Sequence, residues 1–146
     1  MLGGWFRFLV KNVTDQTFTY NSGARIITSI LPWKMTSGAR ANGSLITDDS
    51  AFLTTAGTLA ANAVTVGTKR DNTTLLHIGF TGNFRCVADV SSTDGTMDLY
   101  MEMGSADATW ISDEADFDIT KHCILLAKLP FSTDAEDEGA QIPFSF

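Results

Sequence analysis

The sequence predicts an all-β protein: a single antiparallel β-sandwich or jelly-roll-like domain over residues 1–146, with at most one short helix. Apolar and polar side chains alternate without a break over residues 97–103, which is the period that a half-buried antiparallel strand requires. Glycine, asparagine and aspartate separate several other short apolar runs, as turns do. Threonine is frequent, and its branched Cβ favours pleated strands over helices. With 146 residues, 44% of them hydrophobic, the chain can form one core.

The N-terminal part contains three predicted strands, over residues 5–10, 17–20 and 26–31. Polar turns follow the first two. Pro32 is expected to end the third, because proline cannot donate a hydrogen bond to a strand ladder. Residues 35–44 are small, polar and contain glycine, which predicts an exposed loop or arm.

The region 48–66 allows at most a short helix. Asp48, Asp49 and Ser50 could cap its start. One face would then carry Phe52, Ala56, Leu59, Ala60 and Ala63. Gly57 and several threonines oppose a helix in this region.

The second half carries clearer strand signals. Residues 75–84 form an apolar, partly alternating run. Gly82-Asn83 predicts a tight turn, after which the alternation resumes as far as Val90. Asp94-Gly95 predicts a hairpin that leads into the strand at 97–103, because this dipeptide suits two-residue hairpin turns.

Two acidic segments flank the last strands. Residues 104–118 form a polar, acidic connection, and residues 134–139 form an acidic loop. The carboxylate cluster at residues 113–118 lacks the glycine and the closing glutamate of a calcium-binding loop, so a solvated acidic loop is the simpler interpretation. Between them residues 123–129 predict a strand, which Pro130 should end.

The formal net charge is −7, and Lys69-Arg70 is the only adjacent pair of basic residues. An acidic protein with scattered cations repels phosphates, so no nucleic-acid partner is expected. The apolar run near the start is short and interrupted by Arg7, unlike a secretory signal or a spanning helix. We therefore expect synthesis in the cytoplasm and no membrane partner.

No set of residues in the sequence indicates catalysis. Cys86 and Cys123 lie in apolar runs and are interpreted as free thiols, although a single disulfide stays open. His77 is expected to face solvent or an interface, and His122 to begin a strand. The spacing of these four residues matches no zinc motif, so no metal, no cofactor and no catalytic residue is predicted. An enzyme is the last of the function classes considered.

Aromatic and aliphatic side chains gather at both ends of the chain. Residues 1–12 and 140–146 are candidate interface-forming arms, with six candidate contact residues: Trp5, Phe6, Phe8, Ile142, Phe144 and Phe146. Large apolar side chains of this kind are frequent anchors at protein interfaces. The alternative is that both termini simply complete the sandwich. The sequence does not decide between these two interpretations.

A family resemblance appears over residues 71–129. Asp71-Asn72-Thr73-Thr74-Leu75 leads into the first of three strands, and Gly95-Thr96-Met97-Asp98-Leu99-Tyr100 lies in the third. This order resembles a loosely defined group of virion proteins of tailed bacteriophages, which are β-sandwich or jelly-roll particle components. The chain departs from the group at Ala108-Thr109-Trp110, where a Gly-Thr-Thr-Tyr run is usual.

The resemblance implies a virion structural protein. Within that class we expect a capsid decoration or cement protein that binds the major capsid protein, forms a homo-oligomer with a trimer favoured, and resides in the virion. A tail, head-completion or fibre-associated virion protein is the alternative. A carbohydrate-binding β-sandwich module is the second alternative, because Trp33, Tyr100 and Trp110 could offer stacking surfaces.

Overall fold

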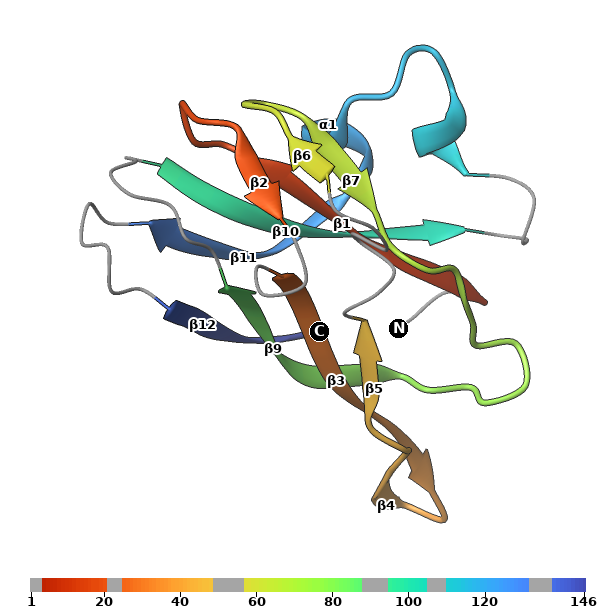
Figure 1. The fold of residues 1–146 in the computed structure, drawn as a ribbon. Helices are drawn as coiled ribbons and strands as arrows, with labels where there is room; N and C mark the ends of the chain where they lie inside the picture. Colours follow the sequence, from red (N-terminus) through yellow and green to blue (C-terminus); the bar gives the residue numbers. More distant parts are fainter. Residues whose placement is uncertain (1–3, 21–24, 49–56, 88–94, 105–109, 132–137) are drawn as a thin grey trace.

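The computed structural model describes residues 4–20, 25–48, 57–87, 95–104, 110–131 and 138–146. In this part of the chain two five-stranded antiparallel sheets pack face to face, and a small two-stranded sheet lies beside them (Figure 1). The predicted all-β antiparallel sandwich is confirmed. No helix in the described ranges is long and apolar enough to cross a membrane.

The first sheet has the order β11-β10-β1-β7, and β8 also pairs with β1. Its strands are β1 (Trp5–Asn12), β7 (Val64–Val66), β8 (Arg70–Asp71), β10 (Gly95–Gly104) and β11 (Ile124–Phe131). The N-terminal segment is thus a central strand of the sheet and not a free arm, because β1 is paired on both edges.

The second sheet has the order β12-β9-β3-β4, and β5 also pairs with β3. Its strands are β3 (Arg25–Thr36), β4 (Ala39–Asn42), β5 (Ile46–Asp48), β9 (Gly79–Val87) and β12 (Glu138–Ser145). The C-terminal segment forms an edge strand here. The two-stranded sheet pairs β2 (Phe18–Tyr20) with β6 (Gly57–Leu59).

The core lies between the two sheets and follows the alternation of their strands. Met97, Leu99 and Met101 point into it from β10, as the period of two predicts. Aromatic rings fill its centre: Phe80 of β9 stacks on Phe6 of β1 with ring centroids 6.1 Å apart, and it meets Phe8 edge-on at 5.6 Å. These contacts join the two sheets across the sandwich.

Two strands, β3 and β11, continue past the proline that was expected to end them. Proline is tolerated in a strand where its nitrogen does not need to donate a hydrogen bond to a neighbouring strand. Pro32 lies within β3, between the stretch paired with β5 and the stretch paired with β4. Pro130 lies in β11, at the edge of the first sheet. Neither ends its strand as predicted.

The predicted loop at residues 35–44 is a β-hairpin, formed by the end of β3 and by β4. Ser37 and Gly38 form its turn with φ angles of 50° and 82°, the left-handed pair that two-residue hairpins prefer. The hairpin projects from the sandwich (Figure 1).

The short helix allowed at residues 48–66 is absent from the described part of that region, where β6 and β7 lie. Phe52 and Ala56, two of its proposed face residues, fall outside the described residues. The helical structure that is described consists of a 3-10 turn, η1 (Ile111–Asp113), and a four-residue helix, α1 (Ile119–His122).

The hairpin predicted at Asp94-Gly95 does not join β9 to β10, since these two strands belong to different sheets. Asp94 itself lies outside the described residues. Gly95 has a φ of 138°, and a Cβ there would lie 2.6 Å from the carbonyl oxygen of Val13. The glycine therefore permits a close approach of two chain segments rather than a hairpin turn.

The tight turn predicted at Gly82-Asn83 is also absent, because β9 runs straight through it. A Cβ on Gly82 would lie 2.5 Å from the carbonyl oxygen of Ser29 and 3.0 Å from the ring of Phe144. Glycine is present at this position because the neighbouring strands leave no room for a side chain.

We expect Gly82→Ala to lower the free energy of unfolding by about 1–3 kcal/mol, as overpacked sites do. Urea denaturation checks this. Gly38→Ala is not a suitable control because its φ is positive, so Thr81→Ala on the exposed face of the same strand serves instead. Equal stability of the Gly82→Ala variant and the native chain would contradict the crowding at this site.

Candidate functional site

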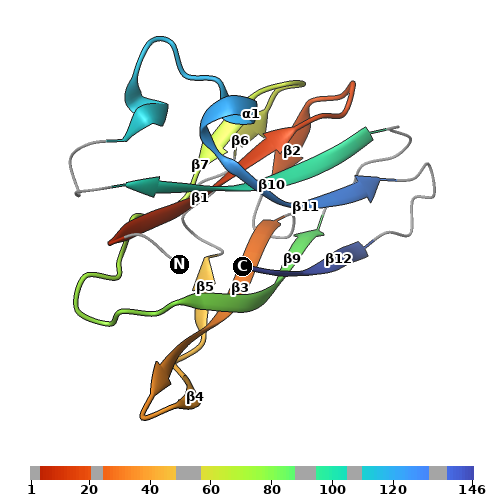
Figure 2. The same ribbon diagram turned by 180° about the vertical axis from the view of Figure 1, so that it is seen from behind.

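The outer face of the first sheet is covered by the chain itself. The segment 110–123, which we call the cover segment, carries η1 and α1 and lies over β1 and β10 (Figure 2). Beneath it Asp98, Tyr100 and Glu102 of β10 are buried, although the alternation alone predicts that they face solvent. The strand is therefore buried on both faces.

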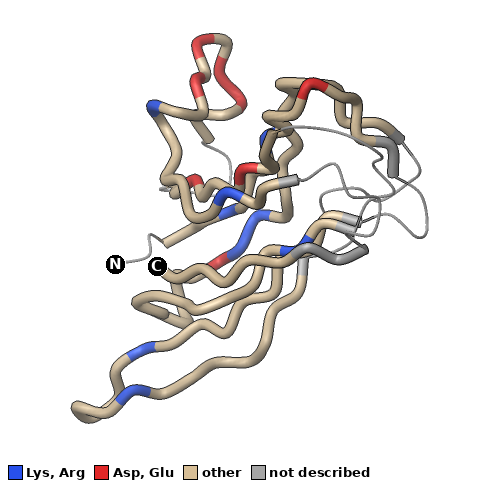
Figure 3. The backbone as a smooth tube through the Cα atoms, turned by 90° about the vertical axis from the view of Figure 1, so that its left-hand side faces the viewer, with Lys and Arg blue, Asp and Glu red and all other residues tan. Residues whose placement is uncertain are grey.

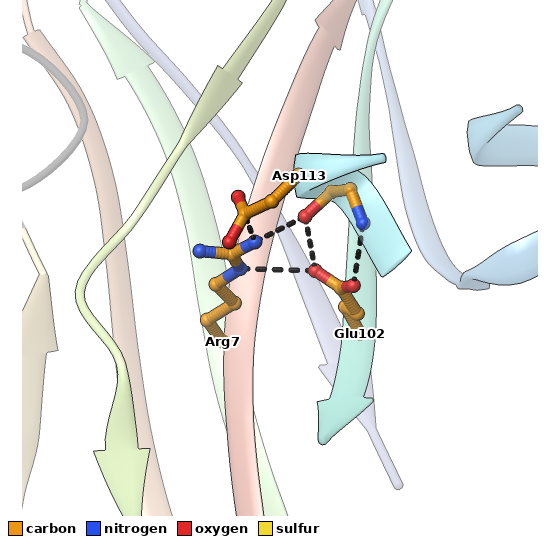
Figure 4. A network of polar contacts seen from close by, with 4 residues as sticks. Arg7, Glu102 and Asp113 are labelled. Carbon is orange, nitrogen blue, oxygen red and sulfur yellow. Dashed lines mark hydrogen bonds and ion pairs between the residues drawn. The ribbon is translucent and has the colours of Figure 1, made fainter. Parts of the chain in front are cut away.

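The strongest polar contacts of this layer centre on Arg7 and Glu102, which lie opposite each other on β1 and β10 (Figure 4). The Arg7 Nε donates to Glu102 Oε2 at 2.9 Å, and the side chains are 5% and 1% exposed. From the cover segment, Ser112 donates to Glu102 through its backbone N–H at 2.9 Å and its hydroxyl at 2.5 Å. Asp113 accepts from Arg7 Nη2 at 3.0 Å. This network attaches the cover segment to the sheet.

Apolar contacts complete the attachment. The Arg7 guanidinium lies over the buried ring of Trp110, 4.3 Å from its centroid. Leu9, Tyr100 and Ile119 form a second small core, against which Phe117 and Cys123 pack.

The side chain of Asp118 caps α1 by accepting from the Thr120 backbone N–H. Bonds from the Thr120 hydroxyl and from Lys121 hold the pKa of Asp118 below its usual range.

A second surface of interest is the hairpin end, which we define as Trp33, Lys34, Met35, Arg40, Leu75 and Leu76. The Arg40 guanidinium lies over the Trp33 ring, 5.1 Å from its centroid. Lys34 Nζ donates to the carbonyl oxygen of Leu75 at 3.2 Å, so the loop at 72–78 is tied to the hairpin. The predicted strand starting at residue 75 begins only at Gly79, because this loop precedes it.

Asn72 fixes that loop. Its side chain donates to the carbonyl oxygen of His77 at 3.0 Å and accepts from the His77 N–H at 2.8 Å. Leu76, held inside this loop, has a φ of 50°, a conformation that costs a non-glycine residue about 1–2 kcal/mol. The chain thus keeps an exposed leucine in a strained backbone conformation.

The outer face of the second sheet is open, in contrast to the covered first sheet. Thr81, Asn83 and Arg85 of β9 and Ser145 of β12 are exposed on it. A shallow depression of about 620 Å³ lies there, lined in part by Ser29, Thr81 and Gly82. Apolar side chains line the same depression, among them Leu31, Leu45 and Pro143, so this face carries both polar and apolar groups.

The structure separates the residues considered for metal binding. His77 is buried beside Gly43 and does not face solvent; burial first, and then the charge of Lys34, lowers its pKa. Cys86 lies in the main core, whereas His122 and Cys123 lie on the cover segment. Among the described residues no three His, Cys, Asp or Glu side chains form a group that could hold a metal ion. Both described thiols are free, as predicted.

We expect both thiols to react slowly with a thiol reagent at pH 8, because burial raises their pKa values, that of Cys123 to about 12. Cys123 should react before Cys86, since it is half-buried on the cover segment and Cys86 is inside the core. Timed alkylation followed by peptide mass spectrometry measures the order. Faster labelling of Cys86 would contradict the packing described here.

The terminal aromatic residues predicted as interface contacts lie mostly inside the sandwich. Phe6, Phe8 and Phe144 are buried in the main core, and Ile142 and Phe146 pack against it. Trp5 is half-buried. The three core side chains cannot touch a partner without leaving the core. This packing agrees with the second of the two interpretations of the sequence, in which both terminal segments complete the sandwich.

A scan against protein-family models, a search of curated proteins and a search of solved structures each found no match to this chain.

Proposed function

We propose that this chain is a bacteriophage virion structural protein, a capsid decoration protein that binds the major capsid protein and stabilises the shell. Its sequence resemblance over residues 71–129 supports this class. The observation that carries the proposal is the difference between the two sheet faces. One is closed by the chain's own cover segment, whereas the other is open and presents polar and apolar side chains together.

An open sheet face suits a large, evenly curved partner such as a capsid shell. Its exposed threonine, asparagine and serine side chains can form hydrogen bonds with a partner, and the neighbouring leucine and proline side chains offer apolar contact area. Many weak contacts of one kind would add up over a shell with repeated sites, as multivalent binding does. A homo-oligomer, with a trimer favoured, would further raise the number of contacts per particle.

Quantitative mass spectrometry of virions produced by the genome that encodes this chain tests the proposal. A copy number near that of the major shell protein, or a simple fraction of it, is expected. A few copies per particle would favour the tail, head-completion or fibre-associated alternative. Absence from virions would overturn the virion role.

A surface variant tests the face itself. Thr81→Arg with Asn83→Arg places two large cations on the open face and should reduce binding to shells that lack the protein. Thr58→Arg with Thr68→Arg, two exposed positions away from the open face, makes the same charge change and should bind as the native chain does. Equal binding of both variants would rule out the open face as the contact.

A further inference from the structure

The hairpin end carries a positive charge on each face of the hairpin. Arg40 pairs with Met35 across the hairpin and lies over Trp33 on one face, while Lys34 belongs to the opposite face of β3. In the described part of the chain neither cation forms an ion pair with a carboxylate.

Both cations are held in place. The Arg40 Nε donates to Asn42 Oδ1 at 3.2 Å while its guanidinium lies on Trp33, and Lys34 is tied to the Leu75 carbonyl. Side chains fixed before binding lose less conformational entropy when a partner arrives. The hairpin end is therefore suited to bind without much further ordering.

Exposed apolar side chains surround these cations. Leu76 is 67% exposed and Met35 is 50% exposed, and Leu75 is exposed as well. The strained φ of Leu76 keeps its side chain outside the core at a cost in stability. Cations among exposed apolar side chains fit a partner surface that is acidic and partly apolar.

The chain itself carries such a surface on the cover segment. Asp113, Glu114 and Asp116 are exposed there, no basic residue occurs between Trp110 and Thr120, and Ile111 is 41% exposed. The hairpin and the acidic part of the cover segment lie on opposite sides of the sandwich (Figure 3). The two surfaces therefore cannot meet within one subunit.

We propose that the hairpin end of one subunit binds the cover segment of a second copy of this chain. The contact is heterologous, because two different surfaces meet, and such contacts close into rings or continue as open assemblies. Attraction between the two patches acts against the general repulsion between subunits of like net charge. The inference does not rest on the virion role, since it concerns association of the purified chain alone.

Sedimentation velocity of the purified chain tests the contact. We expect concentration-dependent association that weakens as NaCl is raised from about 50 mM to about 500 mM, because salt screens exposed charges. Arg40→Glu should weaken association at least about tenfold, since it places like charges together. Arg85→Glu makes the same charge change on an exposed strand position away from the hairpin and should leave association unchanged.

A mixing experiment identifies the partner surface. The variant Lys34→Glu with Arg40→Glu and the variant Glu114→Lys with Asp116→Lys should each stay monomeric alone. Their mixture should associate, because the native hairpin of the second variant meets the native cover segment of the first. Circular dichroism confirms that each variant is folded before mixing.

Two results would overturn the proposal. One is a native chain that stays monomeric at all concentrations tested in low salt. The other is association that Arg40→Glu and Arg85→Glu reduce equally, or that mixing does not restore, because the hairpin would then not be the contact. Neither result would bear on copy number in virions, so a failure here is distinguishable from failure of the proposed function.

Discussion

Replacing Glu102 with alanine is expected to lower the free energy of unfolding by about 3–5 kcal/mol, the usual cost of removing one partner of a buried ion pair. Glu102 is the acceptor for Arg7 Nε and for two donors of Ser112. Without it the Arg7 charge stays buried with part of its hydrogen bonding lost, and the cover segment loses its main attachment. Denaturation in urea, followed by tryptophan fluorescence, measures the change.

Asp113→Asn is the matched control, because Asp113 is the other carboxylate on Arg7 but its side chain is 58% exposed. An exposed partner contributes about 1 kcal/mol or less. Replacing both charges, by Arg7→Met with Glu102→Leu, should cost less than Glu102→Ala alone, since no buried charge is left unpaired. Equal losses for Glu102→Ala and Asp113→Asn would show that the network does not hold the cover segment as described.

Phe80→Ala should also cost about 3–5 kcal/mol, as is usual when a buried aromatic ring is deleted. Phe80 is 0% exposed and stands at the centre of the sandwich. It contacts Phe6 and Phe8 in one sheet, and Phe144 and Phe146 in its own. Its removal would leave a cavity between the two sheets, which neighbouring rings can only partly fill.

Differential scanning calorimetry of Phe80→Ala measures this loss as a lower midpoint of thermal unfolding. Leu45→Ala is the control, because Leu45 is among the most exposed apolar side chains and its truncation should change stability by about 0.5 kcal/mol or less. A loss below about 1 kcal/mol for Phe80→Ala would contradict the aromatic core.

The fold class was predictable because apolar and polar side chains alternate regularly along β10. The burial of the polar side chains of this strand could not be predicted. The cover segment reads as a solvated acidic loop, so Asp98, Tyr100 and Glu102 were expected at the surface. Trp110 could have indicated that this segment packs on the sheet, because a tryptophan side chain is usually largely buried. A second signal was Arg7, a charge in the middle of an apolar strand, which needs a buried partner.

The hairpin end could not be predicted for a different reason. Residues 35–44 are short of apolar side chains, so the sequence favoured a loop, and the pairing of β4 depends on its neighbour β3. Leu76, the exposed leucine in the loop at residues 72–78, is held in place by the hydrogen bonds between Asn72 and His77. The hydrophobic pattern of the sequence does not reveal such bonds. Local patterns therefore located the strands of the core but not the surfaces proposed to bind.

The central place of β1 has a consequence for how the chain folds. Arg7 and its partner Glu102 are 95 residues apart in the sequence, so β1 is made long before β10, the strand that pairs with it along its whole length. Contacts between distant residues slow folding, because a long loop must close before they can form. During synthesis β1 must wait for residues 95–104 to leave the ribosome. We therefore expect slow refolding, and a nascent chain whose aromatic first strand benefits from chaperone protection.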